Sequence, residues 1–93
     1  MPLSALDTFD VTRPWSLSAQ VSLRDESFGA LAYHHVTRRL VFLKSRELVT
    51  LVRRLAEFDS AEAAVRELID AHQRDRYVVA LASLAASELL DGR

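Results

Sequence analysis

The segment Gly29–Ser45, GALAYHHVTRRLVFLKS, predicts two β-strands joined by a short polar turn. We expect the strands at Ala30–His35 and Arg39–Lys44. The second strand contains four consecutive apolar residues, Leu40–Leu43. Both of its faces are therefore apolar, because neighbouring side chains of a strand point to opposite sides. Such a strand needs cover on two sides, whereas the helical patterns that follow would cover only one.

An alternating pattern precedes this segment. In Ser16–Arg24, SLSAQVSLR, apolar residues occupy nearly every second position, which is typical of a half-buried antiparallel strand. Asp25–Gly29 follows as a turn in which Gly29 is free to adopt a positive φ. Because consecutive strands usually pair as neighbours, the simplest topology is a three-stranded meander. Its last strand, Arg39–Lys44, would lie at the edge with unpaired backbone groups, and we expect another polypeptide to pair with it.

Two helices are expected directly after the sheet. Ser45 is suited to cap the first helix, whose apolar stripe lies within Leu48–Leu55. The second helix is expected over Ser60–Ala71. Asp59 and Glu62 have the spacing of a capping box at its start.

A third helix is expected from Asp75 to about Leu90, with Gly92 in the left-handed position after it. This helix is rich in alanine and serine, and small side chains allow another backbone to approach closely. One interpretation is tight packing onto the other two helices; the alternative is that one flank forms the wall of a groove. Its buried stripe is expected to contain Val78, Leu81, Ala82, Ala85 and Leu89.

The pattern as a whole predicts an α+β fold, with a three-stranded antiparallel sheet followed by three helices. The 93 residues are enough for one domain, which we place at residues 16–93, after an arm at residues 1–15. Phe9 and Trp15 are candidate anchors for this arm. Two interpretations remain open for it, a partly disordered terminus and a segment packed on the sheet.

Composition excludes several classes of function. A net charge of −1 and an isoelectric point near 6.3 argue against a dedicated nucleic-acid binder. The absence of cysteine excludes disulfides and thiolate metal sites. The start, MPLSALDTFD, lacks the features of a signal peptide, and the apolar run Tyr77–Leu90 is too short to cross a bilayer. We therefore expect a soluble, cytoplasmic protein.

The residue patterns that carry catalysis are also missing from the sequence. The two glycines, Gly29 and Gly92, cannot make a glycine-rich phosphate loop, and the chain has neither a His-Glu-x-x-His motif nor a serine nucleophile elbow. His34 and His35 are adjacent on a strand and point to opposite faces, so they are poorly placed to share a metal ion. We expect no enzymatic activity, no cofactor and no metal site.

Several motifs resemble those of a known family. They are Arg13-Pro14-Trp15, Phe28–His34 (FGALAYH), Arg38–Ser45 (RRLVFLKS) and the tail ALASLAASELL, and together they cover almost the whole chain. The chain is similar to the precursor-peptide chaperones of mycofactocin biosynthesis, which belong to the PqqD-like peptide-recognition domains. The resemblance implies a winged-helix-like fold and a PqqD-like domain at residues 16–93.

The resemblance also implies a partner and a mechanism. Relatives of this kind bind the leader of a ribosomally made precursor peptide and present it to a radical S-adenosylmethionine (SAM) enzyme. The leader adds as a strand to the edge strand and packs against the third helix, a mode known as β-augmentation. The implied peptide-binding residues are Arg39, Leu40, Val41, Phe42, Leu43 and Lys44 on the strand, and Arg76, Val79, Ala80, Ser83 and Ser87 on the helix. Periodicity leaves open which face of the strand is turned to the groove.

Three competing hypotheses remain. A winged-helix protein that binds DNA is disfavoured, because the third helix is mostly small or apolar after Arg76 and carries Glu88 and Asp91. A small enzyme is disfavoured because no nucleophile or cofactor motif is present. A homodimer that pairs through the same exposed edge is compatible with the main interpretation.

Overall fold

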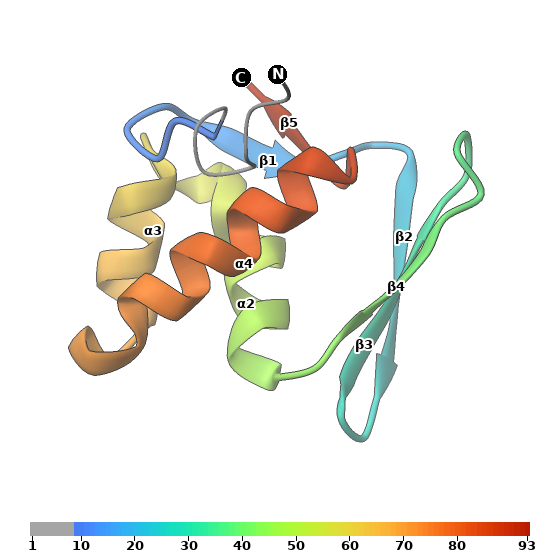
Figure 1. The fold of residues 1–93 in the computed structure, drawn as a ribbon, viewed down its shortest axis with the longest axis horizontal. Helices are drawn as coiled ribbons and strands as arrows, with labels where there is room; N and C mark the ends of the chain where they lie inside the picture. The colour runs from blue at the N-terminus through green and yellow to red at the C-terminus, as the bar shows by residue number, and fades with distance from the viewer. Residues whose placement is uncertain (1–8) are drawn as a thin grey trace, which may run out of the picture.

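A computed structural model describes residues 9–93, and the predicted arm at residues 1–15 lies partly outside this range. The chain forms a three-stranded antiparallel sheet followed by three α-helices, and a small two-stranded sheet joins its ends (Figure 1). This confirms the predicted α+β class. The elements are β1 (Trp15–Leu17), β2 (Val21–Glu26), β3 (Gly29–His34), β4 (Leu40–Leu43), α2 (Arg46–Arg54), η1 (Leu55–Glu57), α3 (Ala61–Leu68), η2 (Ala71–Gln73), α4 (Arg74–Ala86) and β5 (Leu90–Gly92).

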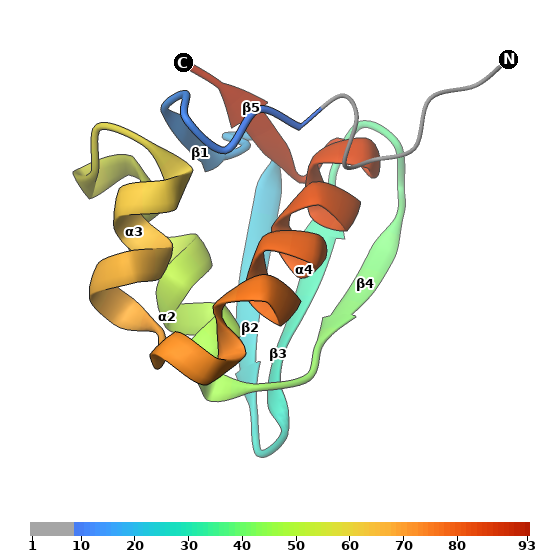
Figure 2. The same ribbon diagram turned by 60° about the vertical axis from the view of Figure 1, so that its left-hand side comes forward.

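The larger sheet has the predicted meander order β2-β3-β4. In the register of β3 with β4, Ala30 lies opposite Leu43, and Ala32 lies opposite Val41. Ala30, Ala32 and Leu43 are buried, at 0%, 0% and 1% exposure, so this face of the sheet carries the core. Residues of α2 pack against it, and α3 and α4 lie on the same side (Figures 1 and 2). The helices therefore cover one face of the sheet, as the sequence predicted.

The predicted strand Ser16–Arg24 is wrong as one element, because the chain turns at Ser18. The Ser18 hydroxyl accepts a hydrogen bond from the Gln20 amide (3.1 Å), and the Ser18 carbonyl accepts one from the Val21 amide (3.1 Å). This local turn separates β1 from β2. The alternation runs through the turn unchanged, so periodicity alone did not reveal it.

The predicted C-terminal end of the third helix is also wrong. Helix α4 ends at Ala86, and Glu88 takes the left-handed conformation (φ 65°) that had been assigned to Gly92. The Leu89 amide bonds the Leu84 carbonyl (2.9 Å), and the Glu88 amide bonds the Ala85 carbonyl (3.0 Å), which is a Schellman motif. The reversal frees Leu90–Gly92 to form β5, which pairs antiparallel with β1.

Serine side chains begin two of the helices. The Ser45 hydroxyl accepts a hydrogen bond from the Leu48 amide (3.0 Å), as predicted, and caps α2. Ser60 caps α3 through the Ala63 amide (3.0 Å), so the predicted cap at Asp59 is off by one residue. Helix α4 begins at Arg74 without a side-chain cap, one residue before the predicted Asp75.

The buried stripe of α4 differs in part from the prediction. Leu81 and Ala82 are buried as expected, but Val78 and Ala85 are only half-buried. Tyr77 and Leu84 are buried in their place, and Leu89 is buried after the helix has ended. A helical period alone does not specify which side of α4 faces the other helices.

The described part of the arm is anchored by Phe9 and Trp15. The two rings contact each other at a tilt of 36° with their centroids 4.7 Å apart, and Trp15 Nε1 donates a hydrogen bond to the Asp10 carbonyl (2.8 Å). The carbonyls of Val11 and Arg13 accept hydrogen bonds from the first amides of α3. This segment packs on α3 rather than on the three-stranded sheet.

Of the helices between residues 9 and 93, none combines the length and the apolar character that a bilayer crossing needs.

Candidate functional site

Strand β4 lies at an edge of the sheet, and the direction of its backbone groups can be derived from its pairing. The His34 amide donates to the Arg39 carbonyl (2.9 Å), so bonds to β3 are made at this position. Hydrogen-bonded and non-bonded pairs alternate along an antiparallel ladder. The amide and carbonyl groups of Val41 and Leu43 therefore point to β3, as those of Arg39 do. The amide and carbonyl groups of Leu40 and Phe42 point instead to the open edge.

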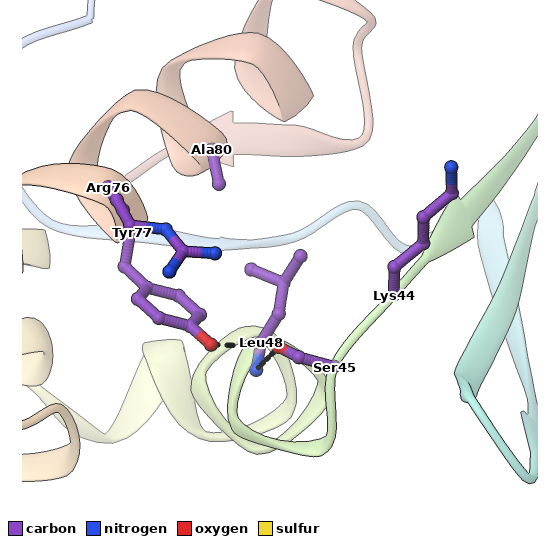
Figure 3. Close-up of a pocket in the computed structure, with 6 residues that line it drawn as sticks. All are labelled: Lys44, Ser45, Leu48, Arg76, Tyr77 and Ala80. Atoms are coloured by element: carbon purple, nitrogen blue, oxygen red, sulfur yellow. Dashed lines mark hydrogen bonds between the residues drawn. The ribbon is translucent and has the colours of Figure 1, made fainter. Parts of the chain in front are cut away.

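A hollow of about 160 Å³ lies where the end of β4 faces α4 (Figure 3). Lys44, Ser45 and Leu48 line it on one side, and Arg76, Tyr77 and Ala80 line it on the other. We call these six residues the groove. Its two cations, Lys44 and Arg76, are exposed and form no ion pair with any of residues 9–93. The groove thus combines an apolar floor with an excess of positive charge.

Tyr77 fixes the distance between the two sides of the groove. Its side chain is buried, and its hydroxyl lies 2.9 Å from Ser45 Oγ and donates to Glu47 Oε2 (3.4 Å). Because Ser45 Oγ also accepts from the Leu48 amide, one hydroxyl cluster joins α4 to the first turn of α2 (Figure 3). The side-chain network sets the position of α4 relative to the end of β4.

The structure brings together some of the predicted site residues. Lys44, Arg76 and Ala80 line the groove, and Leu40 and Phe42 present the open backbone edge. The other predicted residues do not line the groove. Ser83 lies one turn further along α4, Ser87 is the C-cap residue after the helix rather than part of it as predicted, and Val79 is 51% exposed beside Ala80. Arg39, Val41 and Leu43 direct their backbone bonding groups to β3, and the Leu43 side chain belongs to the core.

The sequence interpretation missed Ser45, Leu48 and Tyr77 as groove residues. A signal was available for Ser45 and Leu48, because a helix cap directly after an edge strand must lie at the end of that edge. Tyr77 had no such signal. Its role depends on α4 crossing the start of α2, which joins residues about thirty positions apart.

Residues 9–93 hold no group of three or more side chains arranged to bind a metal ion, and all their buried side-chain polar atoms have partners. Two hydrogen bonds from Thr12 lower the pKa of Asp10, but this exposed turn lies at the N-terminal arm, outside the groove. Strand β4 offers an open backbone edge, and the groove next to it offers an apolar floor and two cations.

Comparison with known proteins identifies the family. The model described as the peptide chaperone MftB family matches residues 14–91. The chain belongs to the MftB family of peptide chaperones. This confirms the family resemblance read from the sequence.

Relatives in the MftB family are similar over most of their length. Peptide chaperone MftB of Mycobacterium ulcerans (strain Agy99) is 45% identical over 83 residues, which cover 88% of this chain and 76% of that protein. The proteins of the same name from Mycobacterium tuberculosis (strain ATCC 25618 / H37Rv) and Mycolicibacterium smegmatis (strain ATCC 700084 / mc(2)155) are 43% and 42% identical. Those matches cover 88% and 89% of this chain, and 76% and 82% of the respective relatives. No solved structure gave a significant match. The relatives are named as peptide chaperones rather than enzymes, which supports a non-enzymatic role.

Proposed function

We propose that this protein is a peptide chaperone that binds the leader of a precursor peptide by strand addition and presents it to a radical SAM enzyme in mycofactocin biosynthesis. The observation that carries the proposal is the open edge of β4 next to the groove. Membership of a family of peptide chaperones supports a peptide as the ligand.

The backbone of β4 would provide affinity that depends little on the leader sequence. Leu40 and Phe42 offer two amides and two carbonyls along the open edge. Each net hydrogen bond of this kind contributes about 0.5–1.5 kcal/mol. An added strand would turn the three-stranded sheet into a four-stranded one, with β4 no longer at its edge.

The groove would supply selectivity. Alternate side chains of the added strand would point toward the helices and enter the space between β4 and α4. Ala80 leaves room for an apolar side chain over Leu48 and Tyr77, whereas Lys44 and Arg76 favour an acidic one nearby. Ser83 continues the same flank of α4 and Ser87 follows at the end of the helix, so a longer leader would meet them next.

Presentation would work through effective concentration. A leader held on β4 keeps the rest of the precursor close to any enzyme that is bound to the same chaperone. The chemistry then belongs to the radical SAM partner, and this chain contributes binding and placement.

The edge can be tested with two substitutions at one position. Phe42→Thr removes the ring but keeps the backbone donor, whereas Phe42→Pro removes both. Calorimetry with the precursor peptide should show that Phe42→Pro binds about 3- to 10-fold more weakly than Phe42→Thr, the equivalent of one lost hydrogen bond. Circular dichroism establishes that both variants are folded. Equal affinity of two folded variants would contradict strand addition at this edge.

Val41→Pro serves as a contrasting variant. The amide of Val41 faces β3, so this proline removes a bond inside the sheet rather than at its edge. We expect it to lower the free energy of unfolding more than Phe42→Pro does. The two prolines thus separate damage to the sheet from damage to the binding edge.

A further inference from the structure

The face of the sheet that points away from the helices carries an apolar surface. It consists of Phe28, Leu31, Tyr33, Leu40 and Phe42, which we call the outer face. Leu31 lies opposite Phe42, and Tyr33 lies opposite Leu40, on the side of the sheet opposite to the buried Ala30 and Ala32. Figure 1 shows the helices gathered on the other side of the sheet.

Several large apolar side chains of the outer face are exposed to solvent. Phe28, Leu40 and Phe42 are 42%, 53% and 55% exposed. The rings of Phe28 and Phe42 contact each other edge to face, with centroids 5.9 Å apart, and Leu31, Tyr33 and Leu40 line a shallow hollow of about 360 Å³. Contiguous exposed apolar surface with aromatic residues is typical of a protein–protein interface.

Cations surround the outer face. Arg24 borders the hollow, an Arg38 nitrogen lies 3.5 Å from the Tyr33 hydroxyl, and Lys44 shares a second hollow with Phe28 and Phe42. Glu26 pairs with Arg24 (2.7 Å), whereas neither Arg38 nor Lys44 has an ion pair in the described part of the chain. The charged side chains around the outer face that have no ion pair among the described residues are therefore positive.

This charge pattern selects among partners. Two copies of the chain that met through their outer faces would place cations against cations, which disfavours self-association. A partner with acidic residues around an apolar centre would pair with the free cations and bury the aromatic side chains. The outer face is a broad sheet surface, and a partner that covers it needs a surface of fixed shape. We therefore expect a folded protein rather than a flexible peptide.

We propose that the outer face docks a folded protein with an acid-rimmed apolar surface, and that this partner is the radical SAM enzyme. The inference rests on the proposed function, since it assigns a surface to the enzyme named there. Strand β4 then serves two partners at once. Its backbone edge takes the leader, and the side chains of Leu40 and Phe42 take the enzyme.

The two binding events would be coupled. A leader strand added beside β4 would place every second side chain on the outer side of the sheet, next to Leu40 and Phe42. The enzyme would then contact a surface made of both chains. Coupling of this kind is reciprocal, so bound leader should tighten enzyme binding by the same factor as bound enzyme tightens leader binding.

The test uses Leu40→Thr combined with Phe42→Thr. Threonine retains the strand propensity and the backbone donors while it removes the apolar side chains. Val36→Thr is the matched control, because Val36 is 68% exposed but lies in the turn outside the outer face. Calorimetry or surface plasmon resonance measures binding of the full chain to the enzyme alone, and then to the precursor peptide alone.

We expect the double variant to bind the enzyme at least about tenfold more weakly, as expected for loss of aromatic and aliphatic anchors. Val36→Thr should match wild type in both measurements. Raising the salt from about 50 mM to about 500 mM should slow association with the enzyme, because it screens Arg38 and Lys44.

A groove variant, Ala80→Arg, distinguishes failure of this inference from failure of the proposed function. It should weaken precursor binding and leave enzyme binding unchanged. A double variant that binds the enzyme as wild type does would overturn docking at the outer face, whatever Ala80→Arg shows. Precursor binding unaffected by Ala80→Arg would instead count against the groove. Sedimentation that shows a wild-type dimer dissociated by the double variant would also overturn the inference, since the outer face would then bind a second copy.

Discussion

Gly29 is the position where a single added methyl group should perturb the sheet most. Its φ of 149° lies in a region that residues with a side chain rarely adopt. A Cβ atom there would lie 2.0 Å from the Leu43 carbonyl oxygen and 3.1 Å from the Ser45 amide nitrogen. Gly29→Ala therefore forces the end of β4 away from β3, next to the groove.

The magnitude follows from two costs. Backbone strain of this kind costs about 1–3 kcal/mol, and relieving the overlap with Leu43 by shifting packed backbone costs about 1–3 kcal/mol more. We expect Gly29→Ala to lower the free energy of unfolding by about 2–6 kcal/mol. Since small domains have about 5–15 kcal/mol in total, much of the stability would be lost.

Urea unfolding followed by circular dichroism measures the effect. With a slope of about 1–3 kcal/mol per M urea, the midpoint should fall by at least about 0.7 M. Gly92→Ala is the matched control, because a Cβ at Gly92 would meet only the Trp15 ring at 3.9 Å, an ordinary contact. A Gly29→Ala midpoint within the error of that of Gly92→Ala would refute the reasoning, since both would then tolerate a side chain.

Three further predictions concern the groove, the caps and the faces of the sheet. Tyr77→Phe should lower the free energy of unfolding by about 0.5–1.5 kcal/mol and weaken precursor binding, which calorimetry measures; unchanged values for both would show that the hydroxyl cluster does not hold the groove. Ser60→Ala should lower the free energy of unfolding, measured with urea, by about 1 kcal/mol, whereas Asp59→Ala should leave it nearly unchanged. A larger loss for Asp59→Ala than for Ser60→Ala would instead support the capping box predicted at Asp59 and Glu62. Leu43→Ala should cost about 2–5 kcal/mol and Phe42→Ala much less, because only the first side chain is in the core; equal losses would contradict the assignment of the two faces.

Short-range patterns predicted much of this fold. The apolar run Leu40–Leu43 and the helix cap Ser45 each act through residues a few positions away. These features were therefore predicted at the positions where the structure has them. The edge position of β4 was predicted from the order of the strands. Of the residues predicted to bind the peptide, Lys44, Arg76 and Ala80 line the same hollow, and their role in binding stays a prediction.

Other features could not be read from local patterns. A turn at Ser18 and a reversal at Glu88 free Trp15–Leu17 and Leu90–Gly92 to pair, and these strands are separated by nearly the whole chain. Alternation also looks the same whichever face of β4 points inward, because both faces are apolar. Only the register with Ala30 and Ala32 assigns one face to the core and the other to the surface.

The chain's own residue order thus established the α+β class, the sheet edge and the family resemblance, because hydrophobic period, turn chemistry and capping are local properties. The three-dimensional arrangement established the pairing of β1 with β5, the place of Tyr77 in the groove and the direction of the outer face. Each of these depends on contacts between segments far apart in the sequence, which no local pattern specifies.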